Sequence, residues 1–504
     1  MKKIILFIIS VGYLPVVLAQ GQQEIPAMQL AADSTRHLLY QAGKLTPSFI
    51  HLLMPAAYNT ARLDYGVIAG KFMAAQDATN DKTFRFNTEG KTVIGKTDLW
   101  GSFDYQRTSE DSTHFAHQSR NNTSTPYYFG SPANLSYHRV IYTARAGGQR
   151  RFFNEHMPVV ASIDYRIGNH FSVNDPRGSI RDYQFNMNAG TGYAWRQKLI
   201  ATIDGYYGYG AEVVNISYKN TTYSESTVYA NYVNYMINGY SEPNPKLSDR
   251  NYTTRFRRSG GGVSILYKDK VFGTFALTAK RIKEKQFYYY PSSAGFDTLA
   301  YYNITKTELH ALWSKNKWAA KFDYNTQKGG DYQINYKANN YQYRSKDYTF
   351  RAVYTGRIFN YGLQLNNNSE ERLDGVTGNH VSYEHYTIQP NIGWNHANKN
   401  KDRWGADLAL HYTESIHPSI YTTSINVSYF THQVIQYNYY YNAATTAGGR
   451  FSLQYTKHFK GFYAGLKGTI AYTEAIKESA LILDGAMKPG KDRTYGNLAI
   501  QFYF

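Results

Sequence analysis

The end of the chain alternates strictly between apolar and polar side chains. From Thr494 to Phe504, every second residue falls on one face, and that face carries mostly large apolar groups. Side chains of a β-strand point to opposite faces with a period of two, so the segment predicts an amphipathic strand. Such a strand can close a transmembrane barrel against the first strand, with an aromatic ring at the membrane–water interface. The residues expected to face lipid and to act in membrane insertion are Leu498, Ile500, Phe502 and Phe504.

The same alternation recurs earlier in the chain. Many apolar faces end in Tyr, Trp or Phe, and the opposite faces carry Asn, Gln, Thr, Gly and single charges. A soluble β-sandwich or β-solenoid would also alternate, but its inner face would hold large Val, Ile and Leu and its outer face Lys and Glu. An aromatic girdle around an apolar band, with a wet interior, favours an all-β fold, an antiparallel transmembrane β-barrel. The segments are 185–195, 386–394, 404–412, 451–456 and 462–472.

Connection lengths predict how the barrel is oriented. Outer-membrane barrels have short periplasmic turns and long extracellular loops, and the connections here alternate in that way from a first strand at Thr60–Ala74. Both chain ends are then periplasmic, which requires an even strand number; we count about 18 strands, with 14 and 16 as alternatives. Residues Ile420–Tyr441 are interpreted as a hairpin within an extracellular loop. The long loops are expected near 109–137, 214–252 and 417–445.

The N-terminal region divides into an export signal and an arm. A basic start, an apolar stretch and small residues before Gln20 predict a signal peptide at residues 1–19. Residues 20–58 then precede a barrel at 59–504; Met28–Gln41 has a weak helical pattern with Asp33 and Ser34 as its cap. The arm is either a partly ordered periplasmic segment or a hatch folded into the lumen, because a barrel of this width is open unless something fills it.

Composition supports an exported membrane protein. The chain has no cysteine, which removes disulfides and thiolate metal sites, and its 50 tyrosines raise the aromatic content to 16%. Tyr and Trp favour membrane–water interfaces. The net charge of +18 is dispersed and falls mainly in the short turns, so lipopolysaccharide and other outer-membrane lipid are the expected partners, and nucleic acid is not.

Charged side chains on the predicted inner faces are candidates for function. Rings of charge in a lumen set ion selectivity, and pairs of opposite sign also brace a barrel wall. Both signs are present here, which favours bracing. The lumen-facing candidates are Arg139, Arg145, Arg166, Lys321, Arg351, Asp407 and Lys467; Asp164, Asp204 and Asp323 also fall on the predicted inner faces.

Motifs for catalysis or metal binding are weak. His114 and His117 have a metal-like spacing but no helix or carboxylates to complete a site, so no metal and no cofactor are predicted. We find no G-x-S-x-G, H-E-x-x-H or phosphate-binding loop pattern, which leaves a barrel hydrolase as the third hypothesis. The long loops are rich in tyrosine, and exposed aromatic patches mark binding surfaces, although packing within the loops is an equal alternative. The loop candidates are Tyr229, Tyr232, Tyr235, Tyr439 and Tyr440.

The mature start at Gln20 and the ending Gln501-Phe502-Tyr503-Phe504 resemble those of Bacteroidota outer-membrane proteins. More narrowly, the chain is similar to a family of uncharacterised β-barrels of about 500 residues in that phylum. The resemblance implies association with a TonB-dependent transporter or a surface lipoprotein; the chain itself does not look like such a transporter. The leading hypothesis is a porin-like barrel in the cell outer membrane that binds or passes a solute, or supports an uptake or secretion assembly. A plugged barrel that acts as a surface-binding scaffold is the alternative.

Overall fold

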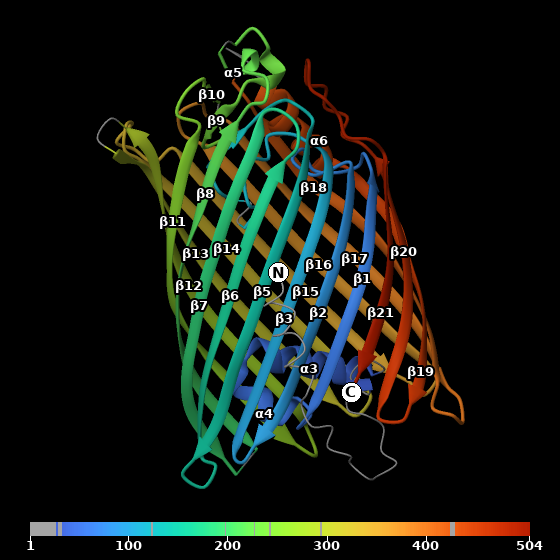
Figure 1. The fold of residues 1–504 in the computed structure, drawn as a ribbon. Coiled ribbons are helices and arrows are strands. Elements are labelled where there is room, and N and C mark those ends of the chain that lie inside the picture. The colour runs from blue at the N-terminus through green and yellow to red at the C-terminus, as the bar shows by residue number, and fades with distance from the viewer. Residues whose placement is uncertain are drawn as a thin grey trace, which may run out of the picture.

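The computed structural model is a closed antiparallel barrel of 18 strands, which confirms the predicted fold class and strand number (Figure 1). It describes residues 27–28, 33–121, 124–196, 198–225, 227–240, 243–292, 295–423 and 429–504. The predicted signal peptide at residues 1–19 lies outside the described residues.

The wall strands follow one another around the barrel in chain order. They are β1 (Tyr58–Gly70), β2 (Asn80–Ile94), β3 (Thr97–Thr113), β5 (Leu135–Phe152), β6 (Met157–Ser172), β7 (Arg177–Trp195), β8 (Leu199–Ser217), β11 (Asn251–Asp269), β12 (Gly273–Ser292), β13 (Gly295–Lys315), β14 (Trp318–Gln333), β15 (Tyr341–Thr355), β16 (Phe359–Asp374), β17 (His380–Ala397), β18 (Arg403–Tyr421), β19 (Thr445–Phe459), β20 (Phe462–Lys477) and β21 (Asp492–Tyr503).

The remaining elements lie before the first wall strand or within the connections. They are α3 (Ser34–Leu45), the 3-10 helix η1 (Pro47–Phe49), α4 (Ile50–Leu53), β4 (Tyr127–Gly130), α5 (Thr222–Glu225), the 3-10 helix η2 (Ala230–Tyr232), β9 (Tyr235–Asn238), β10 (Asn244–Pro245), the π-helix η3 (Thr431–Gln436) and α6 (Tyr437–Ala443). Strands β4, β9 and β10 form a small separate sheet.

The barrel closes because the last strand pairs with the first. In the register of β1 and β21, Leu63 lies opposite Ile500 and Tyr65 opposite Leu498. These four side chains are between 37% and 55% exposed on the outer face, as their alternation requires. Every wall strand therefore has a neighbour on both sides, and no edge is left open to the hydrocarbon.

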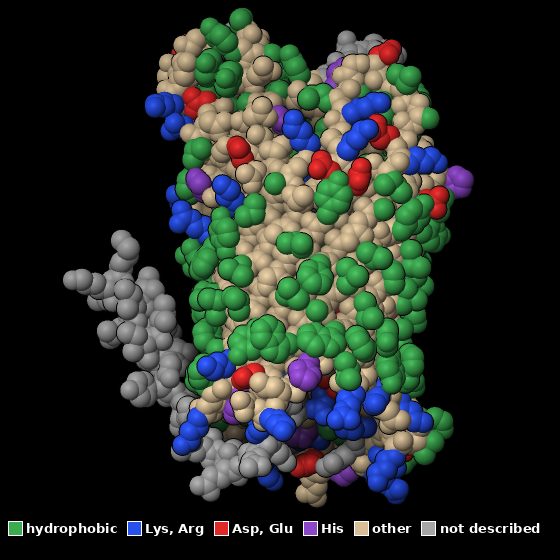
Figure 2. Space-filling view, turned by 90° about the vertical axis from the view of Figure 1, so that its right-hand side faces the viewer, with side chains coloured by type: hydrophobic (Ala, Val, Ile, Leu, Met, Phe, Trp, Pro, Cys, Tyr) green, Lys and Arg blue, Asp and Glu red, His purple; other side chains and the backbone are tan. Residues whose placement is uncertain are grey.

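The outer surface carries the predicted apolar band. Figure 2 shows hydrophobic side chains over the middle and lower part of one face, with charged groups above and below them. Trp195, Trp318 and Trp404 are exposed at the end with short turns, and Tyr183, Tyr386 and Tyr412 are exposed further along the wall. Such rings place their polar edges in the interface and their apolar faces in lipid. Among the described residues, no helix is long and apolar enough to cross a membrane.

The two ends of the barrel differ. At the turn end, adjacent strands are joined by tight turns such as the one between β19 and β20. At the loop end, long connections run from β3 to β5, from β8 to β11 and from β18 to β19. The interpretation of Ile420–Tyr441 as a hairpin is wrong, because η3 and α6 occupy residues 431–443. The tyrosines there follow a helical period in a segment with no lipid face to enforce alternation.

The predicted cap of the arm is confirmed at Asp33, but helix α3 spans Ser34–Leu45 whereas the predicted helical pattern spans Met28–Gln41. The Asp33 side chain accepts hydrogen bonds from the backbone N–H groups of Thr35 and Arg36 and so starts α3. Helices α3 and α4 lie inside the wall near the turn end (Figure 1).

Candidate functional site

An inner plug, which we define as α3, η1 and α4, fills the lumen at the turn end. Its apolar side chains are buried against small and aliphatic groups on the inner faces of seven wall strands, β7 to β15. Ile50 and Met54 pack against Tyr463 and Tyr503 on the opposite side of the barrel. The first cluster joins Leu38, Ala42, Phe49 and Leu53 to Ala194, Ile200, Leu266, Ala276, Leu312, Ala319 and Val353.

Polar contacts hold the inner plug at defined points of the wall. The hydroxyl oxygens of Thr46 and Thr278 lie 2.7 Å apart in a buried position. The side-chain amide of Gln149 donates to the carbonyl oxygen of Ser48 at 3.0 Å. The ammonium of Lys91 donates to the carbonyl oxygen of Ile50 in α4 at 3.3 Å, in addition to the hydrogen bond that this oxygen accepts from the backbone N–H of Met54. The plug is therefore seated by specific bonds as well as by apolar burial.

An outer plug, which we define as the loop segments 114–121, 124–134, 229–240 and 429–443, closes the loop end. Its apolar side chains share one buried cluster with wall residues from β5 to β17. Phe115 and Phe430, from two different loops, meet edge to face with ring centroids 5.4 Å apart. Strand β4 pairs with β9, which joins the first loop to the second. The three loops thus form a single packed unit.

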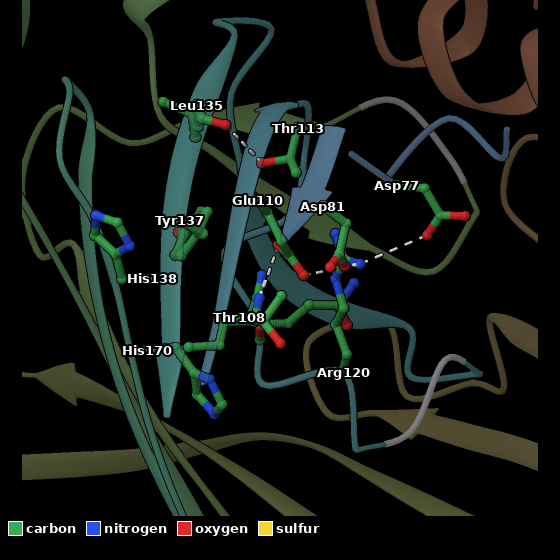
Figure 3. Close-up of polar contacts among 12 residues, drawn as sticks. Asp77, Asp81, Thr108, Glu110, Thr113, Arg120, Leu135, Tyr137, His138 and His170 are labelled. Atoms are coloured by element: carbon green, nitrogen blue, oxygen red, sulfur yellow. Dashed lines mark hydrogen bonds and ion pairs between the residues drawn. The ribbon is translucent and has the colours of Figure 1, made fainter. Parts of the chain in front are cut away.

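Buried charges fasten the outer plug to the wall. Glu110 of β3 accepts a hydrogen bond from Arg139 of β5 at 2.8 Å and lies 3.3 Å from Arg120 of the plug. Figure 3 shows Arg120 between Glu110 and Asp77, with Asp77 at 3.5 Å. Glu110 and Arg139 are each 5% exposed, so their pairing acts in a medium of low dielectric constant and compensates the cost of burying both charges.

A second carboxylate, Asp182 of β7, binds the next part of the same loop. It accepts hydrogen bonds from Asn121 of the plug at 2.7 Å and from Arg166 of the wall, and it lies 2.8 Å from His170. The backbone N–H of Ser119 donates to Glu212 at 3.0 Å. Three wall carboxylates therefore hold residues 119–121 over the lumen.

Histidines of the outer plug are packed separately from each other. His114 is 2.9 Å from the carbonyl oxygen of Pro132, whereas His117 contacts the hydroxyl of Tyr137. Complete burial lowers the pKa of His117 to about 3, because the imidazolium form would lose its hydration. The described residues hold no group of three or more His, Cys, Asp or Glu side chains arranged to bind a metal.

Between the two plugs lies a polar chamber. Arg145, Arg450 and Arg85 point inward from β5, β19 and β2, yet their side chains are 60%, 50% and 48% exposed. Inward-facing groups are exposed only where the lumen holds space for water. A small pocket opens beneath the outer plug; its lining includes Arg120, Asn121, Glu212 and Tyr288. The barrel thus encloses a polar space that is covered at both ends.

The sequence matches a protein-family model over residues 47–504; the model is described as a family of unknown function, DUF6850. The chain belongs to this family. Since the match starts at Pro47, the DUF6850 model includes η1, α4 and every wall strand. No curated protein matches the sequence.

Solved structures with similar folds include bacterial receptors and transporters. The ferric preacinetobactin receptor BauA from Acinetobacter baumannii has 9% identity and a TM-score of 0.44, over 89% of this chain and 80% of the receptor. The FrpB iron transporter from Neisseria meningitidis (F3-3 variant) has 9% identity and a TM-score of 0.43, over 92% of this chain and 83% of the transporter. Similarity at this level gives no information on the solute.

The predicted lumen residues of this DUF6850 barrel separate into two groups. All seven point inward, and five belong to ion pairs of the kind that brace a wall. Arg351 and Lys467 differ, because neither makes a hydrogen bond or an ion pair with any residue the structure describes. The five pairs are Arg139–Glu110, Arg145–Asp164, Arg166–Asp182, Lys321–Asp323 and Asp407–Arg450.

The loop tyrosines divide in a similar way. Tyr439 and Tyr440 are buried at 5% and 4% exposure, so they pack within α6 instead of forming a surface. Tyr229 is exposed, and Tyr232 stacks on Tyr223 with parallel rings 4.1 Å apart. Tyr235 is half-buried against the outer plug. A binding role for the exposed rings stays a prediction.

Ser109 and His138 form a serine–histidine contact, a candidate for a catalytic pair among the described residues. Ser109 and His138 face the outside, with the hydroxyl 2.9 Å from Nδ1, and Figure 3 shows His138 turned away from the buried charges. Within the described residues, no carboxylate or amide contacts His138 to orient it, as nucleophilic catalysis by a serine–histidine pair requires.

Sequence reasoning missed the outer plug and the anchors of the inner plug. Tyr127–Gly130 is a short apolar run between two strands and was the available signal for a plug segment. The partners of Thr46 and Gln149 lie more than 100 residues away, and no local pattern encodes such contacts.

Proposed function

We propose that this DUF6850 protein is an outer-membrane barrel that binds a solute in its lumen and passes it when the two plugs move. The polar chamber between the plugs carries the proposal. A barrel that serves only as a closed scaffold does not need arginines that point into the lumen and remain exposed. If the interior were fully packed, such charged side chains would be absent from it. The loop end is then extracellular and the turn end periplasmic, in accordance with the lengths of their connections.

The alternative is a surface scaffold whose lumen is permanently closed. The large apolar cluster of the outer plug favours it, because displacing that cluster exposes many buried rings to water. The exposed ring of Tyr229 and the half-buried ring of Tyr223 would then contribute to a binding surface. A surface lipoprotein, a TonB-dependent transporter and lipopolysaccharide are the proposed partners in either case.

Planar-bilayer conductance distinguishes the two functions. The tested proteins are the full chain, a variant without residues 33–54, a variant with 114–134, 229–240 and 422–444 each replaced by a short Gly/Ser linker, and a variant with both sets of changes. We expect silence from the full chain and steady openings from the double variant, because either plug alone still covers the chamber. Refolded protein is first checked by its altered gel mobility without heating.

A folded double variant that never conducts would contradict solute passage and support the scaffold. Steady conductance of the unmodified chain would contradict the closed state at rest. Openings in one single-plug variant alone would show that the other plug does not seal the lumen.

A further inference from the structure

Among the described residues, two cations in the chamber have no carboxylate within ion-pair distance. Arg351 on β15 and Lys467 on β20 both point into the lumen and are half-buried. In the part of the chain that the structure describes, neither one hydrogen-bonds or pairs with another side chain. A half-buried cation without a partner loses part of its hydration without compensation.

The surroundings of these two residues are also cationic. Arg351 interacts electrostatically with Arg450 and with Asp407, and Lys467 interacts with Arg450, Asp407 and Arg62. Asp407 is already 3.6 Å from Arg450, and Arg62 is paired with Asp64 at 3.1 Å. Four cations therefore share two carboxylates on this side of the chamber.

The inner plug borders the same region. His37 on α3 interacts electrostatically with Arg351, Lys467 and Lys44. Its ring nitrogen Nε2 lies 2.8 Å from the side-chain amide of Gln41, so a polar surface of the helix faces the chamber. The unpaired cations thus lie between the wall and the top of the plug.

We propose that Arg351, Lys467 and the neighbouring Arg450 bind an anion that carries carboxylate or phosphate groups. Guanidinium groups match such oxygens with two parallel hydrogen bonds, and an ammonium supplies a point charge beside them. The bound anion neutralises the excess of positive charge that the two carboxylates leave. The inference rests on the proposed function in that the chamber takes up a solute, and it narrows that solute to an anion.

Equilibrium unfolding in urea tests the site without requiring the probe to pass the plugs. The full chain is refolded in detergent with millimolar pyrophosphate, with citrate, or with chloride at equal ionic strength. A ligand that binds only the folded state raises its stability according to concentration and affinity. We expect pyrophosphate or citrate to raise the urea concentration at the unfolding midpoint. The anion that raises it more shows whether the site prefers phosphate or carboxylate groups.

The decisive variant is R351Q/K467Q, and the control is K321Q/D323N. Lys321 of β14 lies directly opposite Arg351 of β15 in the strand register and is ion-paired with Asp323. The control therefore removes an ion pair from the same height of the lumen and leaves the net charge unchanged. The first variant should weaken the affinity for the anion about tenfold or more. The control should change it by less than about threefold.

Absence of stabilisation by both anions, or equal losses in the two double variants, would overturn the site. Its failure differs from failure of the proposed function. A double-plug variant that conducts while the full chain binds neither anion refutes the site alone. Anion binding in a barrel that never conducts refutes passage alone.

Discussion

Leu38 tests whether apolar docking keeps the inner plug in the lumen. Its side chain is 1% exposed and packs between α3 and the wall, so Leu38→Ala leaves a cavity at the contact. Such truncations cost about 2–5 kcal/mol. A loss of about 3 kcal/mol would raise the population of undocked plug by about two orders of magnitude. A free helix of this length is marginal in water, so undocking exposes its amides.

Hydrogen exchange followed by mass spectrometry measures this population directly. Peptides covering residues 34–45 should exchange about a hundredfold faster in Leu38→Ala, while strand peptides stay unchanged. Leu45 is the matched control, since it lies on the same helix at 37% exposure, and Leu45→Ala should change exchange by less than about threefold. Equal effects of the two substitutions, or no effect of Leu38→Ala, would refute the idea that apolar contacts keep the inner plug docked against the wall.

Three further predictions concern the loop end. In the wild type, the pKa of His117 in the folded state, about 3, lies below its value in the unfolded state, so acid favours unfolding. Urea titrations of the wild type should therefore show a loss of about 2 kcal/mol in the free energy of unfolding between pH 7 and pH 5. His117→Phe removes the titrating group and should remove this loss. Glu110→Gln should cost about 3–5 kcal/mol by leaving buried arginines uncompensated, whereas Asp77→Asn, at the exposed end of the network, should cost less than about 1 kcal/mol in the same assay. Gly329→Ala should destabilise the barrel by about 1–3 kcal/mol, because its new methyl group meets the buried ring of Tyr302; wild-type stability would contradict that packing.

The wall strands could be predicted from the sequence because one face of each strand contacts lipid. Leu453 and Leu466 face hydrocarbon, and alternation along their strands follows because every second position meets the same solvent. Several strands extend well beyond the segments whose alternation predicted them, as in β18, which reaches Tyr421 whereas its predicted segment ends at residue 412. There the wall leaves the membrane, and water and loops replace lipid as its neighbours.

The plugs were less predictable from the sequence because their side chains pack against distant parts of the same chain and not against lipid. Asp33 could be identified as a helix cap, since capping is a local interaction between a side chain and the next turn. The burial of Tyr439 and Tyr440 depends on which loops meet them, and composition alone favours surface and core equally for a tyrosine. Likewise, alternation placed Arg351 in the lumen but could not show whether a carboxylate from another strand would reach it.

The two plugs differ in how the chain holds them, and this difference sets the expected order of opening. The inner plug continues into the wall through the short connection between Leu53 and Tyr58, so it can leave once its own contacts break. Each long loop of the outer plug is attached to wall strands at both ends, and the loops are packed on one another through β4, β9 and the ring of Phe430. Release of one loop therefore strips contacts from the others and costs more free energy than release of the arm. Gating should begin at the turn end, with the outer plug moving only when its loops separate together.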